Sequence, residues 1–235
     1  MTTSSRSMAD VVYGVTMQTR QVAIYGGGGF AREVAWLIQS CNDGDTAYQV
    51  VCLIDDDVAA HGTLLNGIPV VGLETARQRF PQANVVGAVG SPHTRQLLME
   101  KAMAAGFHFE TIIHPRVERS TWIEIGAGTV VCAGTILTTN IVLGQHVQIN
   151  LDCTIGHDVN MGDYTTLAPG VHVSGCVQFG RRAYVGTGAV ILNGTRDDPI
   201  VIGEDAVVGA AACVTKSVPA GVTVVGVPAR PLQRP

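Results

Sequence analysis

The 235-residue sequence has few charged and few aromatic residues. Only 14% of its residues are Asp, Glu, Lys or Arg, and only 5% are Phe, Trp or Tyr. The formal net charge of −4 argues against a nucleic acid as the main partner. Hydrophobic residues make up 46% of the chain, which excludes global disorder and provides a core for one or two folded domains.

The chain also shows no sequence signal for a membrane or for secretion. No apolar run approaches the roughly 18 residues that span a bilayer, and the first 20 residues hold no continuous apolar stretch of the signal-peptide kind. The six cysteines are dispersed and form no C-x-x-C pair. Such cysteines predict reduced core thiols, so we expect a cytoplasmic protein without membrane insertion.

The opening segment is expected to be a disordered leader over residues 1–19. Met8 and Met17 both precede the first clear strand pattern, and Met17 is a second candidate for the natural start. An ordered extra strand around residues 11–15 is the alternative.

Residues 20–114 alternate strand and helix patterns, which predicts a small Rossmann-like α/β domain with a parallel sheet. Its apolar runs end in glycines or acidic residues, as strands of such sheets do when they lead into loops. The predicted strands are 21–25, 50–54, 84–89 and 107–113, the predicted helices are 30–40, 73–80 and 93–105, and a hairpin turn is expected at Asn66-Gly67.

From Ile125 onward an apolar residue recurs at every sixth position. Twelve consecutive hexads begin with an apolar residue and carry a small or β-branched residue four positions later, and six of them have glycine at the second position. After an interruption at residues 197–201, three more hexads begin at Ile202. Chance does not produce such a run. We interpret each hexad as a short strand plus a turn, so that three hexads close one triangular coil of 18 residues and residues 115–235 form a parallel β-helix.

This repeat resembles the hexapeptide-repeat acyltransferases, whose β-helix is left-handed, whereas the usual crossover rule alone would predict right-handed coils. The segments IYGGGGFAREVAWLI, LIDDD and AVGSP are similar to the subgroup that acylates sugars and nucleotide-linked amino sugars, with sialic-acid O-acetyltransferase-like and bacillosamine-pathway N-acetyltransferase-like members. The similarity extends from about Arg20 to Arg230. It implies a left-handed β-helix, acetyl-CoA as co-substrate and a homotrimer.

His157 is the candidate general base. It occupies the third, outward-facing position of its hexad, and acyl transfer from a thioester needs a base that works near neutral pH. Gly175 follows 18 residues later, one coil away at about 4.8 Å, and its backbone N–H is a candidate oxyanion donor. Asp158 is the candidate helper that holds the imidazole. His157-Asp158 also matches the histidine and acidic residue that the resembling family uses, and the alternative is a solvated turn histidine.

The resemblance also implies where acetyl-CoA binds, namely in the groove between neighbouring β-helices of a trimer. The contacting positions map onto Thr166, Thr187 and Ala210, and Thr166 stands where some members have a histidine. Lys216 and Arg230 are candidates to meet the CoA phosphates, with plain turn packing or solvated charge as the alternative. No metal is expected, because the three histidines of the repeat fall at three different phases of the coil.

Gly26-x-Gly28-x-x-Ala31 follows a strand and opens a helix, with Asp55 at the end of the next strand. Helix N-terminal amides attract phosphates, yet by itself this is a weak dinucleotide fingerprint. In the resembling family this loop and the acidic pair hold the sugar nucleotide instead. The matching positions are Gly28, Gly29, Phe30, Asp55, Asp56 and Gly90. Phe30 replaces a histidine common in the amino-sugar enzymes, and a structural turn without a ligand is the alternative.

The sequence therefore predicts an acyl-CoA-dependent N-acetyltransferase that acts on a nucleotide-linked amino sugar in surface-polysaccharide or glycan biosynthesis. His157 would take the proton as the acceptor attacks the thioester directly. O-acetylation of a sialic acid-like sugar is the second hypothesis. More distant hypotheses are an NAD(P)-dependent oxidoreductase, a zinc enzyme of the γ-carbonic-anhydrase kind with its site between subunits, and a non-catalytic scaffold.

Overall fold

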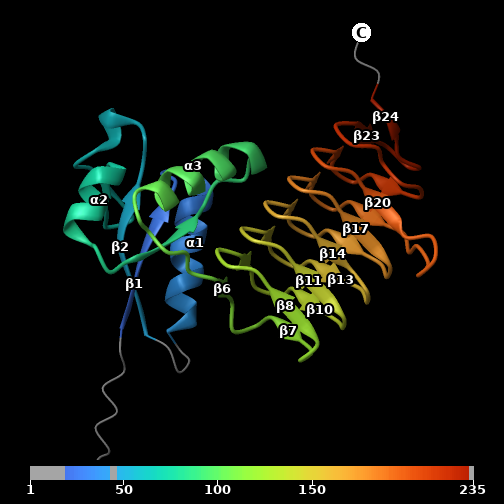
Figure 1. Ribbon diagram of the computed structural model, residues 1–235, viewed down its shortest axis with the longest axis horizontal. Coiled ribbons are helices and arrows are strands. Elements are labelled where there is room, and N and C mark those ends of the chain that lie inside the picture. Colours follow the sequence, from blue (N-terminus) through green and yellow to red (C-terminus); the bar gives the residue numbers. More distant parts are fainter. Residues whose placement is uncertain (1–18, 43–46, 233–235) are drawn as a thin grey trace, which may run out of the picture.

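The computed structural model describes residues 19–42 and 47–232, and it shows an α/β domain that leads into a long β-helix (Figure 1). The expected leader lies outside the described residues, apart from Thr19. Within the described ranges, no helix is long and apolar enough to cross a membrane.

The N-terminal domain is built around one sheet that is covered by helices on both faces. Its elements are β1 (Arg20–Tyr25), α1 (Gly29–Cys41), β2 (Tyr48–Ile54), the 3₁₀ helix η1 (Val58–Ala60), β3 (Leu64–Leu65), β4 (Ile68–Val71), α2 (Leu73–Arg79), β5 (Asn84–Gly87) and α3 (Pro92–Ala104). The strand order is β3-β4-β2-β1-β5, and all neighbours are parallel except β3 and β4. These two form the expected hairpin, and both Asn66 and Gly67 have the positive φ that its turn requires.

Alternate residues of β1 face opposite helical layers. Val22 and Ile24 pack with α1, whereas Ala23 and Tyr25 pack with residues of α2 and α3. α1 and α2 bury apolar side chains on the face that contacts the sheet. α3 buries Met99 and Ala102 on its inner face together with Arg95. α1 begins without a side-chain cap and has no acidic residue in its first turn. Its first amides are thus not capped by a neighbouring side chain.

The predicted strand over residues 107–113 is wrong in extent and in partner. Phe109 makes one isolated bridge with Val85, and the strand itself is limited to β6 (Ile112–Ile113). β6 pairs with the β-helix and not with the N-terminal sheet. Here the chain leaves one sheet to enter the first coil of the next, so a continuous apolar pattern spans two different partners.

The β-helix consists of three parallel sheets, which we call sheets I, II and III. Sheet I contains β6, β9 (Val130–Val131), β12 (Gln148–Ile149), β15 (Thr166–Leu167), β18 (Tyr184–Val185), β21 (Val207–Val208) and β23 (Thr223–Val225), with β24 (Arg230–Pro231) added antiparallel. Sheet II contains β7 (Glu118–Arg119), β10 (Ile136–Leu137), β13 (Thr154–Ile155), β16 (His172–Val173), β19 (Val190–Ile191) and β22 (Cys213–Val214). Sheet III contains β8 (Ile123–Ile125), β11 (Ile141–Leu143), β14 (Asn160–Met161), β17 (Val177–Phe179) and β20 (Ile200–Ile202).

Strand partners confirm the 18-residue coil. Ile136 pairs with Thr154, Thr154 with His172, and His172 with Val190. Val190 then pairs with Cys213, because the interruption adds five residues to that coil. The apolar first positions form one continuous core along the axis.

Most turns of the β-helix contain a residue in the left-handed region. Positive φ recurs at every sixth residue from 128 to 188, and seven of these eleven residues are not glycine. The turn residues concerned are Gly128, Gly134, Asn140, His146, Asp152, Asp158, Tyr164, Gly170, Cys176, Arg182 and Gly188. The left-handed conformation costs a residue other than glycine about 1–2 kcal/mol. Packing between the coils must therefore hold these turns in place.

The two domains are joined by a buried arginine of α3. The side chain of Arg95 is 1% exposed and reaches across to sheet I and its turns. It donates hydrogen bonds to the carbonyl oxygens of Val89, His146, Tyr164 and Thr165, to Gln148 Oε1 and to Thr166 Oγ1. We call Arg95, His146, Gln148, Tyr164 and Thr166 the Arg95 cluster. It fixes the N-terminal domain on one face of the β-helix prism.

Candidate functional site

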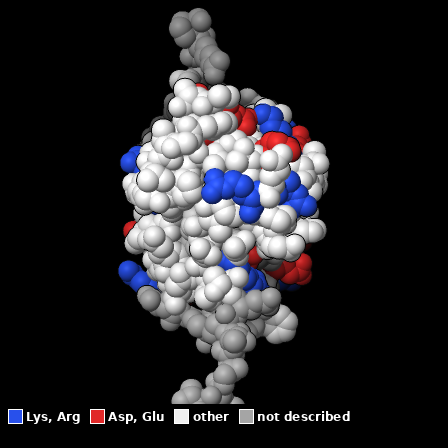
Figure 2. All heavy atoms as spheres, turned by 90° about the vertical axis from the view of Figure 1, so that its left-hand side faces the viewer, with Lys and Arg blue, Asp and Glu red and all other residues white. Residues whose placement is uncertain are grey.

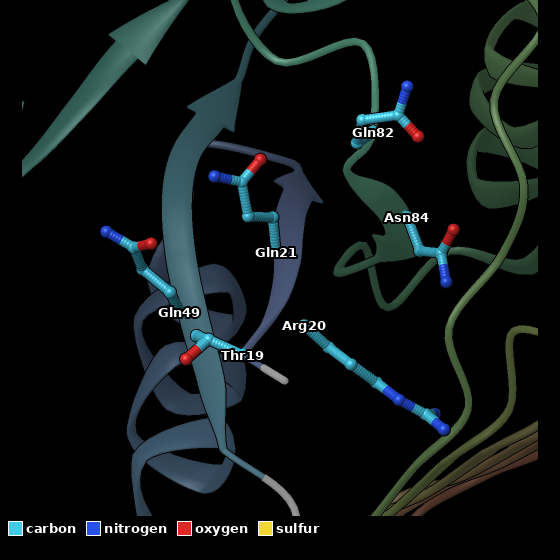
Figure 3. Close-up of a pocket in the computed structure, with 6 residues that line it drawn as sticks. All are labelled: Thr19, Arg20, Gln21, Gln49, Gln82 and Asn84. Carbon is cyan, nitrogen blue, oxygen red and sulfur yellow. The ribbon is translucent and has the colours of Figure 1, made fainter. Parts of the chain in front are cut away.

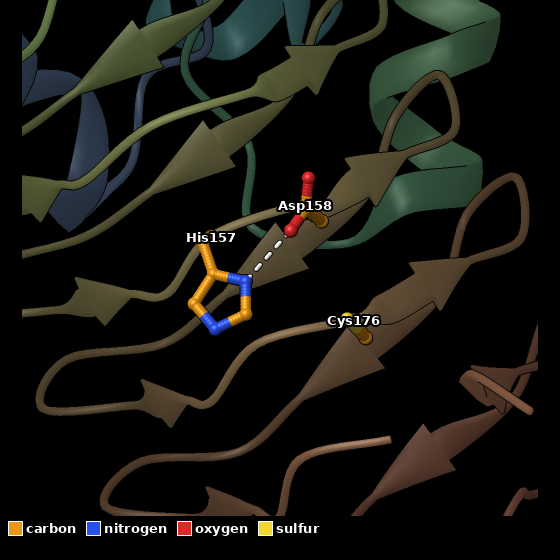
Figure 4. Close-up of side chains that lie close together, drawn as sticks. All are labelled: His157, Asp158 and Cys176. Atoms are coloured by element: carbon orange, nitrogen blue, oxygen red, sulfur yellow. Dashed lines mark hydrogen bonds and ion pairs between the residues drawn. The ribbon is translucent and has the colours of Figure 1, made fainter. Parts of the chain in front are cut away.

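His157 and Asp158 lie on the turn between β13 and β14, at an edge of the prism that we call the His157 corner (Figure 4). His157 Nδ1 is 2.7 Å from Asp158 Oδ2, and the two side chains are 59% and 32% exposed. Asp158 is the left-handed residue of this turn, with φ of 58°. Adjacent outward residues would usually diverge, and the turn instead brings the two side chains together.

Gly175 lies directly beneath the imidazole. A Cβ placed on Gly175 would be 2.4 Å from His157 Nε2, which no real contact tolerates. The predicted slot between coils is therefore present, and the ring fills part of it. Among the described residues, none accepts a hydrogen bond from the Gly175 amide. This N–H is thus free to meet a ligand beside the base.

Asp158 is held as a carboxylate. The hydrogen bond from His157 lowers its pKa, and a second one from Asn140 Nδ2, at 3.3 Å, acts in the same direction. An ionised carboxylate next to Nδ1 favours the tautomer with the proton on that nitrogen. Nε2 then keeps its lone pair for an incoming acceptor, as a general base requires.

A small hollow of about 180 Å³ adjoins the His157 corner on the sheet III side. It is lined by Asp158, Asn160, Cys176, Gln178, Thr195, Arg196 and Pro199. Thr195 and Arg196 come from the loop that the interruption of the repeat creates, and Thr195 is exposed instead of facing inward as its hexad position predicts. Sequence reasoning missed Cys176, although adding 18 to 158 finds it by the arithmetic that found Gly175.

The residues predicted to contact CoA separate into three places. Thr187 and Ala210 are exposed on the corner between sheets I and II, which we call the Thr187 corner. The Ala211 amide donates to the Thr187 carbonyl there. Lys216 follows β22 and lies on the same corner as His157, and it lines one hollow of about 320 Å³ together with Arg230. One chain therefore does not bring Thr187 and Ala210 to the base.

Thr166 does not fit a CoA contact. Its side chain is buried, accepts a hydrogen bond from Arg95 and donates one to the carbonyl of Gly90. The resemblance placed it in a surface groove, but docking of the N-terminal domain on sheet I covers this position. We therefore drop Thr166 from the candidate site.

The positions predicted to hold a sugar nucleotide gather at the carboxyl edge of the N-terminal sheet. Gly28 and Gly29 form the start of α1, and Gly90 follows β5. A Cβ on Gly28 or Gly90 would meet no atom within 4 Å, so this surface is open. The carboxylate of Asp55 rests against Gly27 at the end of β2. Ligands of open α/β sheets bind at this edge.

Phe30 and Asp56 flank that edge in different ways. Phe30, half-buried in the first turn of α1, packs against the apolar cluster beneath the helix. Asp56 accepts hydrogen bonds from Lys101 and from the Tyr25 hydroxyl, and these bonds lower its pKa. Asp56 is therefore engaged within its own domain, whereas Asp55 lies beside the glycine loop.

A larger hollow lies at the opposite edge of the same sheet (Figure 3). It measures about 520 Å³ and is lined by residues at the amino ends of the strands, namely Thr19, Arg20, Gln21, Gln49, Gln82 and Asn84. Because nucleotides bind at the carboxyl ends, size alone does not make this hollow the nucleotide site.

The histidines of the repeat stay apart, as their coil phases predict. His146 is buried in the Arg95 cluster, stacked on Tyr164 at 4.9 Å. His172 is on sheet II, where Nδ1 is 2.8 Å from Thr154 Oγ1. Neither lies with His157, so one chain does not assemble a three-histidine zinc site.

The surface seen in Figure 2 gives no sign of a nucleic-acid interface. On the side of the molecule that faces the viewer there, basic and acidic side chains form small separate groups on a mostly uncharged surface. A continuous basic stripe, the usual electrostatic footprint, is not present on this face.

The chain matches a family model over its N-terminal part and a relative over most of its length. The family model described as the PglD N-terminal domain matches residues 21–102. The chain is 32% identical over 212 residues to GDP-perosamine N-acetyltransferase of Escherichia coli O157:H7, which covers 90% of this chain and 96% of that protein.

Solved structures extend the likeness to the whole fold. WeeI from Acinetobacter baumannii AYE is 36% identical, with a TM-score of 0.81 over 92% of this chain and 100% of that chain. The acetyltransferase domain of PglB from Neisseria gonorrhoeae FA1090, solved in complex with acetyl coenzyme A, is 31% identical, with a TM-score of 0.81 over 92% and 100%.

Proposed function

The chain belongs to the hexapeptide-repeat sugar N-acetyltransferases, and on that premise we propose that it transfers the acetyl group of acetyl-CoA to the amino group of a nucleotide-linked amino sugar. The single observation that carries this proposal is the His157 corner. It combines an exposed imidazole, an ionised partner on Nδ1 and a free backbone N–H beneath the ring.

The chemistry requires one proton transfer and one charged intermediate. The acceptor nitrogen attacks the thioester carbonyl while His157 Nε2 takes its proton. The Gly175 amide is placed to donate to the oxyanion of the tetrahedral intermediate, a contribution of about 3–4 kcal/mol in comparable sites. The C–S bond then breaks, and the protonated imidazole returns a proton to the leaving thiolate. Asp158 stabilises the imidazolium between these steps.

We propose that the active form is a homotrimer. Thr187 and Ala210 lie on one corner of the prism, while His157 and Lys216 lie on another. A second copy whose Thr187 corner faced the His157 corner would bring both sets to one groove. Lys216 and Arg230, which line one hollow, would then meet the CoA phosphates.

The acceptor site would also use two copies. The N-terminal domain docks on sheet I, whereas His157 lies between sheets II and III. A nucleotide held by Gly28, Gly29, Asp55 and Gly90 of one copy would therefore present its sugar to His157 of another. Asp56, which is engaged with Lys101, would shape this edge without touching the ligand.

A free-thiol release assay tests the proposal. Acetyl-CoA is offered with GDP-, UDP- and dTDP-linked amino sugars, GDP-perosamine among them, and with free sialic acid as a hydroxyl acceptor. CoA release with one nucleotide-linked amino sugar supports N-acetylation. Release with the hydroxyl acceptor alone would favour O-acetylation. No release with any acceptor, together with no CoA binding, would contradict both N-acetylation and O-acetylation. The cytoplasmic location stays a prediction that rests on the dispersed cysteines.

A further inference from the structure

Three metal-ligating side chains of different chemistry meet at the His157 corner (Figure 4). One ligand atom each from His157, Asp158 and Cys176 lies within 4.8 Å of the other two. Imidazole nitrogen, carboxylate oxygen and cysteine sulfur form a donor set that suits zinc. Within the described ranges, no other group of three His, Cys, Asp or Glu side chains has its ligand atoms this close together.

The backbone presents two of the donors side by side. Asp158 and Cys176 occupy the same turn position on successive coils, with φ of 58° and 57°, and the Cys176 amide donates to the His157 carbonyl. Their side chains therefore start from equivalent backbone geometry one coil apart. The imidazole rests on Gly175, which directly precedes Cys176 in the sequence. The two coils thus hold the donors together without a loop that must fold around the ion.

The outer limit of the spacing is wider than a bound ion needs. In a tetrahedral site, zinc–sulfur bonds of about 2.3 Å and zinc–nitrogen bonds of about 2.1 Å place the two ligand atoms about 3.6 Å apart. Side-chain rotation has to close a gap of up to about 1 Å, and the three side chains are exposed or half-buried, which leaves them room to rotate. Charge favours binding, since the Asp158 carboxylate faces the ion, whereas Arg196 opposes it from the neighbouring loop. Coordination to zinc takes the proton from the Cys176 thiol.

We propose that Zn²⁺ binds to His157, Asp158 and Cys176, with water completing the tetrahedron, and reversibly inhibits the enzyme. The ion takes the base away from the acceptor, so zinc acts as an inhibitor and not as a cofactor. This regulatory role rests on the proposed function, whereas the binding site itself does not. Replacement of Arg196 by Ala should tighten zinc binding, because it removes the nearby positive charge.

Binding is measured first, without any substrate, by competition with a chromophoric zinc chelator. The wild-type protein is compared with Cys176→Ser and with Cys213→Ser, which alters another half-buried cysteine on sheet II. We expect Cys176→Ser to weaken zinc binding at least tenfold and Cys213→Ser to leave it unchanged. Co²⁺ should also give a thiolate charge-transfer band in the wild type that Cys176→Ser lacks. Equal binding by all three proteins would overturn the site.

Inhibition is then measured by CoA release. Zinc should inhibit the wild type, and a chelator should restore its rate. When each protein is compared with its own zinc-free rate, Cys176→Ser should need at least tenfold more zinc for half inhibition than the wild type and Cys213→Ser. Binding without inhibition would overturn the regulatory role. A protein that binds zinc through Cys176 but acetylates nothing would contradict the proposed function and leave the metal site standing.

Discussion

The His157 corner and the Arg95 cluster are two polar groups built on the same repeating turns, and they differ in what surrounds them. His157 is exposed and paired with an ionised Asp158. His146 is 1% exposed, and no described atom forms a hydrogen bond with its Nδ1. Burial, followed by the nearby Arg95 charge, lowers the pKa of His146 to about 4.

This difference separates a reactive histidine from a structural one. A base must exchange protons with solvent and substrate, which the His157 corner permits. His146 instead packs between Phe109 and Tyr164, where it stays neutral and its carbonyl accepts from Arg95. Burial also lowers the pKa of Arg95, to about 9, which still leaves the guanidinium charged at neutral pH.

The largest expected effect is on activity at the His157 corner. His157→Ala should lower kcat by about 10²–10⁴-fold, the usual contribution of a general base, and leave the unfolding midpoint unchanged because the side chain is exposed. His172→Ala on sheet II is the matched control and should retain wild-type kcat. Near-wild-type turnover by His157→Ala would show that His157 is not the general base.

Substitution of Arg95 should lower the stability of the folded protein. Arg95→Met leaves at least four oxygens without the hydrogen bonds that they now accept from the buried guanidinium. We therefore expect the free energy of unfolding to fall by about 3 kcal/mol. Denaturant unfolding measures it. Arg181→Met, which removes an exposed arginine over Tyr164, should cost less than about 1 kcal/mol. Equal losses in the two variants would mean that Arg95 does not hold the domains together.

The lowered pKa of His146 predicts how the stability of the protein depends on pH. Its pKa is lower in the folded state than the unfolded value of about 6.5, so the folded state binds fewer protons between these values. Stability should therefore fall as the pH drops from about 6.5 to about 4, by at most about 3 kcal/mol from this residue. His146→Phe should flatten that slope relative to the wild type. His172→Ala should keep it.

The smallest of these effects concerns Gly175. Gly175→Ala places a methyl group where the imidazole lies and should reduce kcat by about 10–100-fold through misplacement of the base. Ser174→Ala on the same turn adds no atom near the ring and should behave as wild type. An unchanged kcat in Gly175→Ala would show that the ring tolerates displacement.

The repeat made the β-helix and its site unusually predictable from sequence. Because the coil length is fixed at 18 residues, position 157 predicts the neighbour at 175, and the structure confirms that pair. The end of the N-terminal domain was less predictable, since residues 107–113 read as one apolar run but serve two sheets. The predicted CoA contact of Thr166 was wrong for a related reason. A repeat pattern does not show which face of the β-helix the N-terminal domain covers.

A crystal structure of His157→Asn with CoA and an accepted nucleotide-linked amino sugar tests the proposed mechanism most directly. We predict the acceptor nitrogen within about 3.5 Å of the residue 157 side chain, with the CoA sulfur beside it and the Gly175 amide facing the place of the thioester oxygen. A second copy should supply the Thr187 corner. Ligands bound away from the His157 corner, at the Arg95 cluster or at the amino edge of the N-terminal sheet, would contradict the mechanism.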